Sequence, residues 1–288
     1  MSRPIQRLAG SWGRFARSNA GLSALLTAAL TLLLVLVGEF TAAAGAGATC
    51  NFTYPGCAGQ LSPIGLTIPQ FVEWFHRFFA MIVGLLIVGN AFVLVTAYGR
   101  SRIAGAGAVA AMVLPIQVFL GGVTVTFASL FPAGYAPAVQ LAHLGTALGL
   151  FLALVAALYW IGQRAGVSLR LSTLGFLGLG VTGIQALFAP GHVFVFWPRI
   201  QTAYHLFAHL AVAAFLVVIL RSRSMGSVDG GVAGTLGLGA GLANTFLVIG
   251  VFLVTDGVRT VVSILLFMQL AAFAWIVWVG RGASASSP

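Results

Sequence analysis

Three ionisable residues lie within five positions of the otherwise apolar stretch FVEWFHRFFAMIVG, as Glu73, His76 and Arg77. Charged side chains are costly inside a bilayer, so each of these residues requires a physical reason. On a helix, Glu73 and His76 share one face about a turn apart. The carboxylate could accept a proton or stabilise positive charge beside a group that His76 ligates, or it could simply neutralise Arg77 at i+4.

His76 and His143 follow Pro69 and Pro137 by seven and six residues, on two helices that we expect to enter the membrane from the same side. Their imidazoles should therefore lie at similar depth. Two such imidazoles can hold a planar macrocycle, each giving one axial nitrogen to iron. Zinc would need further ligands, and only one carboxylate is near. We therefore predict a haem here, with Arg77 suited to a propionate because guanidinium matches carboxylate geometry.

The second half of the chain offers a weaker ligand set. Residues 69–90 and 198–219 align without a gap, which makes His205 the positional twin of the first-half histidine, with His209 one turn further on. The last apolar run carries Met268 and no histidine. A haem b in this half would take His–Met ligation, which raises its reduction potential. Met268 could equally be core or lipid-facing filler.

The chain has two cysteines, Cys50 and Cys57, in the segment TCNFTYPGCAG of the longest predicted loop, residues 45–69. We expect this loop on the outer side of the membrane, where disulfides persist, and predict a disulfide that closes a short ring. Free or redox-active thiols are the alternative. A metal site would need further histidine, cysteine or acidic partners, which the loop lacks.

Apolar runs position these residues. Hydrophobic residues make up 60% of the chain and charged residues 6%, against roughly 25% charged in soluble domains. A spanning helix needs roughly 20 apolar residues. The sequence predicts an all-α membrane protein whose eight transmembrane helices form two pseudo-symmetric four-helix bundles; the runs lie near 21–44, 70–98, 104–128, 138–162, 172–190, 200–220, 232–255 and 259–280.

The predicted organisation has four parts. A basic cytoplasmic N-terminus covers residues 1–20, an N-terminal half with the chemical residues covers 21–165, a C-terminal half covers 166–281, and a Gly/Ser-rich disordered tail covers 282–288. The paired prolines and histidines of the two aligned segments support an internal duplication.

Arginine supplies all of the basic charge, 14 residues against four acids, for a net charge of +10. Nucleic acid is one partner of such a chain, but short arginine-bearing spacers between apolar runs favour membrane topology instead. Threading the helices from a cytoplasmic N-terminus puts most of the arginines inside. We expect a plasma-membrane protein in contact with lipid, with no nucleic-acid partner, both termini cytoplasmic and the cysteine loop extracytoplasmic.

The motifs EWFHR and LAHLGTAL, and TAAAGAGATC leading into a cysteine pair, together resemble the haem A synthase family over residues 25–280. The resemblance implies oxidation of a methyl group of haem O to the formyl group of haem A by successive hydroxylations, for the cofactor of terminal oxidases. It also implies a haem O substrate, an electron acceptor, and haem O synthase and a terminal oxidase as partners. Oligomeric state is left undefined.

The resemblance assigns roles by position. The two N-terminal histidines would ligate haem O, Glu73 would stand beside the reacting methyl group, and His205 would ligate haem b in the C-terminal half. Met268 occupies the place of the family's second haem b ligand, a histidine. A His–Met haem, a substitute ligand such as His209, and no haem in this half are the three alternatives.

Two other functions remain open. A b-type electron-transfer cytochrome would place haems toward opposite sides of the bilayer, whereas the predicted ligands lie toward the outer side. A non-catalytic haem-binding assembly factor would share the site without the reaction.

Overall fold

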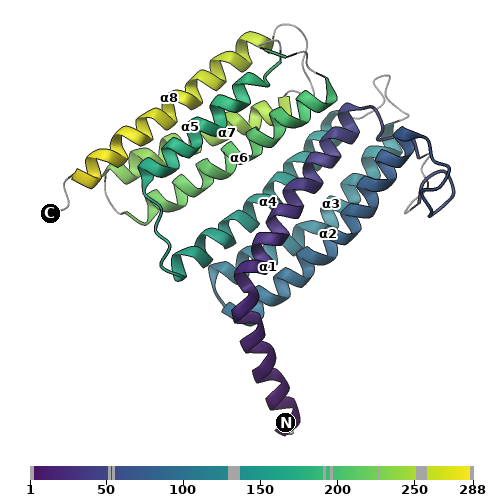
Figure 1. The fold of residues 1–288 in the computed structure, drawn as a ribbon, viewed down its shortest axis with the longest axis horizontal. Helices are drawn as coiled ribbons and strands as arrows, with labels where there is room; N and C mark the ends of the chain where they lie inside the picture. The colour runs from purple at the N-terminus through teal and green to yellow at the C-terminus, as the bar shows by residue number, and fades with distance from the viewer. Residues whose placement is uncertain are drawn as a thin grey trace. The chain divides into compact units, whose positions relative to one another are not determined.

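The computed structural model describes residues 3–50, 53, 56–128, 137–190, 193–194, 197–225, 228–250 and 258–285. These residues form eight helices and no strand (Figure 1). The predicted all-α class is therefore confirmed for the described part of the chain. In chain order the helices are α1 (Arg3–Ala43), α2 (Ile68–Tyr98), α3 (Arg102–Ala128), α4 (Pro137–Arg164), α5 (Leu171–Leu187), α6 (Pro198–Arg223), α7 (Val228–Gly250) and α8 (Val258–Ala285).

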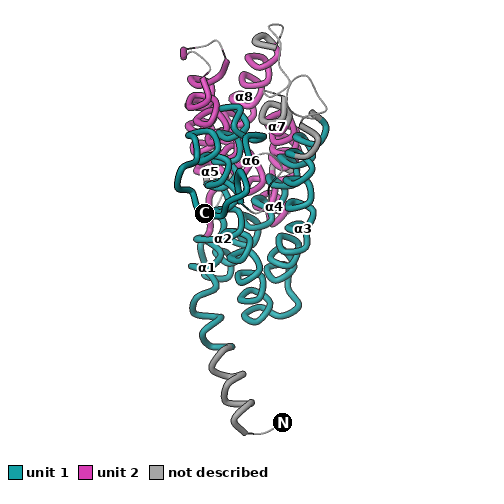
Figure 2. Tube along the Cα trace, turned by 90° about the vertical axis from the view of Figure 1, so that its right-hand side faces the viewer, with its two compact units in different colours: residues 1–167 teal, residues 168–288 magenta. Residues whose placement is uncertain are grey.

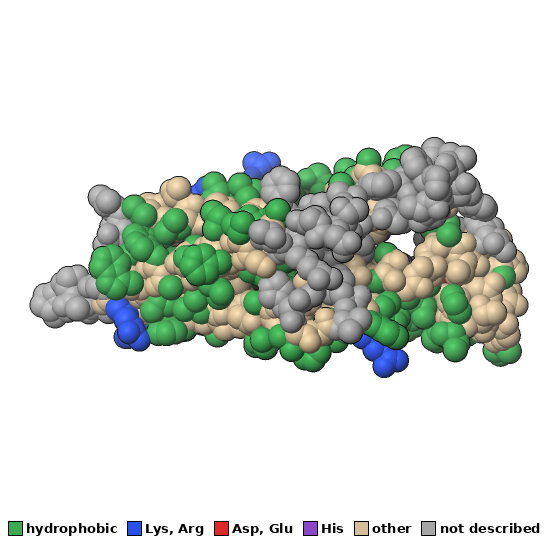
Figure 3. Space-filling view, turned by 90° about the horizontal axis from the view of Figure 1, so that it is seen from above, with side chains coloured by type: hydrophobic (Ala, Val, Ile, Leu, Met, Phe, Trp, Pro, Cys, Tyr) green, Lys and Arg blue, Asp and Glu red, His purple; other side chains and the backbone are tan. Residues whose placement is uncertain are grey.

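Six helices within the described residues are long and apolar enough to cross a membrane, and they belong to α1, α2, α3, α4, α6 and α8. The apolar helix α5, with 17 residues, is shorter. On the face seen in Figure 3, hydrophobic side chains spread over the described surface and arginines appear only in isolated patches. The chain is an integral membrane protein.

The chain divides into two compact units, residues 1–167 and 168–288, drawn in different colours in Figure 2. In unit 1, α1 and α3 each pack against both α2 and α4, so α2 and α4 lie across the unit from each other. In unit 2, α5 and α7 each pack against both α6 and α8. Each unit has its own apolar core, to which all four of its helices contribute.

The helices extend beyond the apolar runs at both ends of the chain. α1 begins at Arg3 rather than near residue 21, so most of the basic N-terminus is helical. Its sequence, RPIQRLAGSWGRFARSNAG, mixes arginine, leucine and alanine, which favour helix without being uniformly apolar. α8 ends at Ala285, so it includes part of the tail expected to be disordered; residues 286–288 lie outside the described part.

Candidate functional site

The start of α2 sets the direction in which its ionisable residues point. Thr67 precedes the helix with extended backbone, and its backbone N–H donates to Oε1 of Gln70 at 3.0 Å, as in a capping box. Pro69 lies in the first turn, where a missing N–H is tolerated. Glu73 and Arg77 follow on a face that is turned inward, since both are buried.

Glu73 and Arg77 form a buried ion pair. Arg77 Nε lies 2.7 Å from Oε1 of Glu73, and the carboxylate residue is 3% exposed. Breaking such a pair would leave an uncompensated buried charge, which is strongly destabilising. The pairing expected at i+4 therefore exists, and its burial distinguishes it from a solvated interfacial pair.

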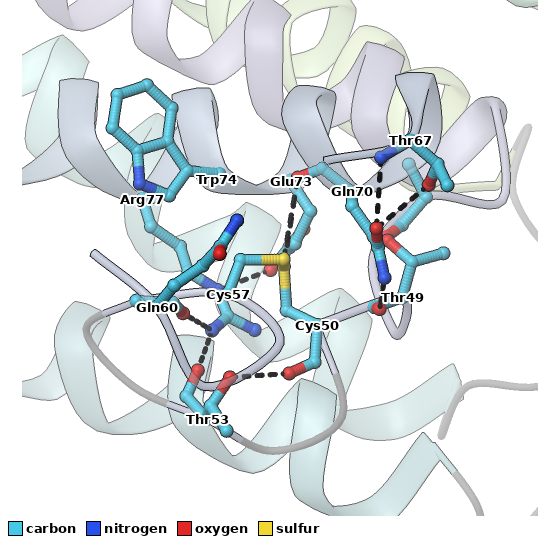
Figure 4. The surroundings of a disulfide bond; sticks show 12 residues. Thr49, Cys50, Thr53, Cys57, Gln60, Thr67, Gln70, Glu73, Trp74 and Arg77 are labelled. Atoms are coloured by element: carbon cyan, nitrogen blue, oxygen red, sulfur yellow. Dashed lines mark hydrogen bonds and ion pairs between the residues drawn. A yellow bond between two sulfur atoms is a disulfide. The ribbon is translucent and has the colours of Figure 1, made fainter. Parts of the chain in front are cut away.

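The second nitrogen of the guanidinium reaches into the cysteine loop. Nη1 of Arg77 donates to the backbone carbonyl of Thr53 and, at 3.1 Å, to that of Gly56 (Figure 4). The sequence suggested a haem propionate as the partner of Arg77. The propionate contact stays a prediction; among the described residues, Arg77 contacts the Glu73 carboxylate and the loop backbone.

A disulfide joins Cys50 and Cys57, as predicted, and neither residue is exposed. Both sulfurs lie against the backbone carbonyl of Gln70, with Sγ of Cys50 at 3.8 Å and Sγ of Cys57 at 3.6 Å. The Gln70 side chain also reaches the carbonyl of Thr49 at 3.5 Å. The disulfide ring is therefore packed directly on the first turn of α2 (Figure 4).

His76 and His143 both lie in unit 1, on α2 and α4, the two helices that face each other across it. Nδ1 of each ring is buried and has no hydrogen-bond partner among the described residues. A buried polar atom without a partner is costly, so each ring has an unused capacity to bind.

Each imidazole packs against a glycine of a neighbouring helix. A Cβ at Gly38 of α1 would lie 2.8 Å from Cε1 of His76, and a Cβ at Gly121 of α3 would lie 3.2 Å from Cε1 of His143. Both separations are shorter than ordinary van der Waals contact. A histidine ring packed against a glycine of a neighbouring helix therefore occurs at both predicted ligands.

For a haem ligated by His143, these contacts predict that Gly121→Ala weakens its binding by about fivefold, because overpacking costs ~1 kcal/mol and displaces the imidazole of His143. Gly122→Ala is the matched control, since a Cβ there would meet no atom within 4 Å. Both changes raise helix propensity equally. Titration with haem, followed by absorbance, measures the difference; equal affinities for the two variants would contradict a role for the glycine.

In unit 2, His205 and His209 are buried on α6. Nδ1 of His209 lies 2.6 Å from the backbone carbonyl of His205, so it donates to that oxygen. The ring of His205 meets that of Tyr204 edge-on, with centroids 5.5 Å apart. Both predicted histidines therefore lie in the interior rather than on the lipid-facing surface.

Met268 differs from these histidines in its burial. Its side chain is 57% exposed, whereas the next residue of α8, Gln269, is fully buried. Haem iron with two axial ligands needs both of them in the interior. The predicted pair of His205 and Met268 consequently does not fit a haem held inside unit 2.

Buried amides in unit 2 were missed by the sequence reasoning. Nε2 of Gln185 donates to Oδ1 of Asn244 at 3.0 Å, and Nδ2 of Asn244 donates to the carbonyl of Ala208 at 2.9 Å. Neither side-chain polar atom of Gln269 has a hydrogen-bond partner among the described residues. Single amides within apolar runs were the available signal, because polar groups in membrane helices usually face a protein interior.

Comparison with known proteins points to haem processing. Over 144 residues, half of this chain, it is 35% identical to a protoheme IX farnesyltransferase of Haloarcula marismortui, covering 29% of that protein. A protoheme IX farnesyltransferase of Halobacterium salinarum is 33% identical over 127 residues, or 44% of this chain and 27% of its own. A heme A synthase of Bacillus licheniformis is 32% identical over 110 residues, or 38% of this chain and 36% of its own.

The chain thus spans well under half the length of each of these relatives. No family model and no solved structure matches it. The shared feature of the relatives' names is enzymatic modification of haem. The chain is accordingly similar to haem-modifying membrane enzymes.

Proposed function

We propose that the protein is a haem A synthase, which oxidises a methyl group of haem O to the formyl group of haem A. Similarity to a heme A synthase and to protoheme IX farnesyltransferases supports a place in haem A and haem O biosynthesis. The oxidative reaction is the part that we infer from the site.

The observation that carries the proposal is the set of residues in unit 1. His76 and His143 lie on α2 and α4, which are across the unit from each other, each with a buried ring nitrogen that has no partner among the described residues, and Glu73 is buried one turn before His76. Imidazole nitrogens are axial ligands of haem iron. We assign the two histidines to the iron of the substrate and Glu73 to the reacting methyl group.

The reaction then proceeds by two successive hydroxylations at one methyl carbon. The resulting geminal diol loses water to give the formyl group. Each hydroxylation takes its oxygen from a water molecule and releases two electrons and two protons, so an electron-transfer partner must accept the electrons. Glu73 accepts a proton or stabilises positive charge that develops beside the ring, because a buried carboxylate near the reacting carbon can do either.

We further propose where the reaction takes place and which proteins supply its substrate and receive its product. Haem O would be delivered by a haem O synthase and haem A passed to a terminal oxidase, within the plasma membrane. The cysteine loop would be extracytoplasmic, where its disulfide is stable. A haem b in unit 2 remains a prediction that rests on His205, with no second ligand supplied by Met268.

Restoration of a haem A-containing oxidase tests the proposal. The chain is produced in a bacterial strain that makes haem O but lacks its own haem A synthase, and the visible spectrum of the membranes is recorded. We expect the haem A absorption to return. A strain carrying the protein in its membranes, at a level verified by immunoblot, that accumulates haem O and forms no haem A would overturn the assignment.

A further inference from the structure

Among the described residues, Arg77 donates to acceptors from two different parts of unit 1. Its Nε donates to the Glu73 carboxylate on its own helix, and its Nη1 donates to the carbonyls of Thr53 and Gly56 in the cysteine loop. Figure 4 shows the guanidinium lying between the carboxylate and the loop, beneath the disulfide. A planar guanidinium that donates to acceptors on two sides has its orientation fixed.

The two carbonyls belong to a segment of the loop that a disulfide closes. The Cys50–Cys57 disulfide joins its ends, and Thr53 Oγ1 donates to the carbonyl of Cys50 at 2.7 Å. At Gly56 the chain turns so closely that a Cβ would lie 2.3 Å from the carbonyl oxygen of Gln60. The positions of both carbonyls therefore depend on the closed ring.

We propose that Arg77 is a positioning residue that transmits the geometry of the disulfide loop to the carboxylate of Glu73. This inference rests on the proposed function, in which Glu73 acts on the substrate. The loop fixes the guanidinium, the guanidinium fixes Oε1 of Glu73, and the carboxylate is thereby held at one place beside the reacting group. A small misplacement of a catalytic group is expensive, about a hundredfold in rate for ~1 Å.

Two simpler roles for Arg77 predict different behaviour. If it only neutralised Glu73, any cation at this position would serve, and Arg77→Lys would be silent. If it bound a propionate, its loss would weaken haem binding regardless of the state of the disulfide. A lysine keeps the charge but has no planar fork that can bridge the carboxylate and two carbonyls.

The test is a mutant cycle on haem O conversion. kcat and KM are measured for the wild type, Arg77→Lys, Cys50→Ser/Cys57→Ser and the combined variant. We expect kcat to fall about tenfold in each of the first two changes, with KM nearly unchanged, because positioning and not binding is lost. In the combined variant we expect no more than about a twofold further loss of kcat, because both changes remove the same connection between the loop and Glu73.

Wild-type kcat in Arg77→Lys, or losses that multiply in the combined variant, would overturn the proposal. Trp74→Phe is the matched control. It removes another tether between the same loop and helix, the 2.9 Å hydrogen bond from Nε1 of Trp74 to the carbonyl of Leu61, without touching Arg77. In the Trp74→Phe background the removal of the disulfide should still lower kcat about tenfold.

A readout that needs no turnover separates this inference from the proposed function. The folded membrane protein is treated with a water-soluble phosphine, which reduces the disulfide to two thiols, and the thiols are trapped with a maleimide. Losing the Arg77 contacts should speed reduction severalfold in Arg77→Lys relative to wild type, because the loop opens more often. Equal reduction rates in wild type and Arg77→Lys would contradict the proposed link between Arg77 and the loop. Faster reduction in Arg77→Lys, in a protein that forms no haem A, would support that link and refute the proposed function.

Discussion

Glu73→Gln is expected to abolish haem A formation while the substrate haem stays bound. Glutamine keeps an oxygen that can accept from Nε of Arg77, so the buried contact at 2.7 Å has a neutral substitute. It lacks a carboxylate that can take a proton or balance positive charge. Loss of a general base or acid lowers turnover by roughly 10²–10⁴-fold. Haem content per protein, and the proportion of haem A in it, are the two quantities to measure.

Glu73→Asp serves as the control for charge. It preserves the carboxylate on a shorter side chain, so we expect partial activity, well above that of the glutamine variant. Full activity in Glu73→Gln would show that the carboxylate has no chemical role and that the ion pair is only structural. Loss of bound haem in the same variant would instead assign Glu73 to binding.

The second large effect concerns the two predicted ligands. His76→Ala and His143→Ala should each lower the affinity for haem O by at least about tenfold, because even groups that merely support a metal ligand are worth about that much. Each variant should also change the absorption spectrum to that of a haem with one histidine ligand. The measurement is a titration of the purified protein with haem O.

Free imidazole provides the rescue. It can occupy the space left by the truncated side chain, so it should restore the two-histidine spectrum in either single variant. Removing His205, in unit 2, should leave the haem O titration unchanged. A wild-type spectrum in His143→Ala would exclude that residue as a ligand and would remove the main support for the site in unit 1.

The helices were predictable where the physical cause is local. Apolar runs of sufficient length gave α2, α4 and α6 nearly at their observed ends, since Pro69, Pro137 and Pro198 mark the helix starts. The N-terminal extension of α1 was missed because hydropathy reports membrane burial and not helix formation. Residues 3–20 are helical without being uniformly apolar.

The partners of Arg77 could not be predicted from its neighbours in sequence. Its pairing with Glu73 follows from i+4 spacing. Its other two acceptors are backbone carbonyls more than twenty residues away, and a carbonyl has no sequence signature. Only the folded loop brings them to the guanidinium.

The direction in which Met268 points depends on its position around the helix. Alignment by motif placed it where the related family has a ligand, but adjacent residues on a helix point about 100° apart. In the structure the inward position belongs to Gln269 and the outward one to Met268. A motif fixes the order of residues, whereas the packing of α8 against α5 and α7 fixes which of them faces the core.

We propose that this chain converts haem O to haem A. The most direct test is extraction and chromatography of the haem from the purified protein, produced in a host that makes haem O. We expect haem A, or the hydroxylated intermediate, in the wild type and haem O alone in Glu73→Gln. Haem b alone in the wild type, with haem O abundant in the same membranes, would contradict the proposal and favour an electron-transfer cytochrome.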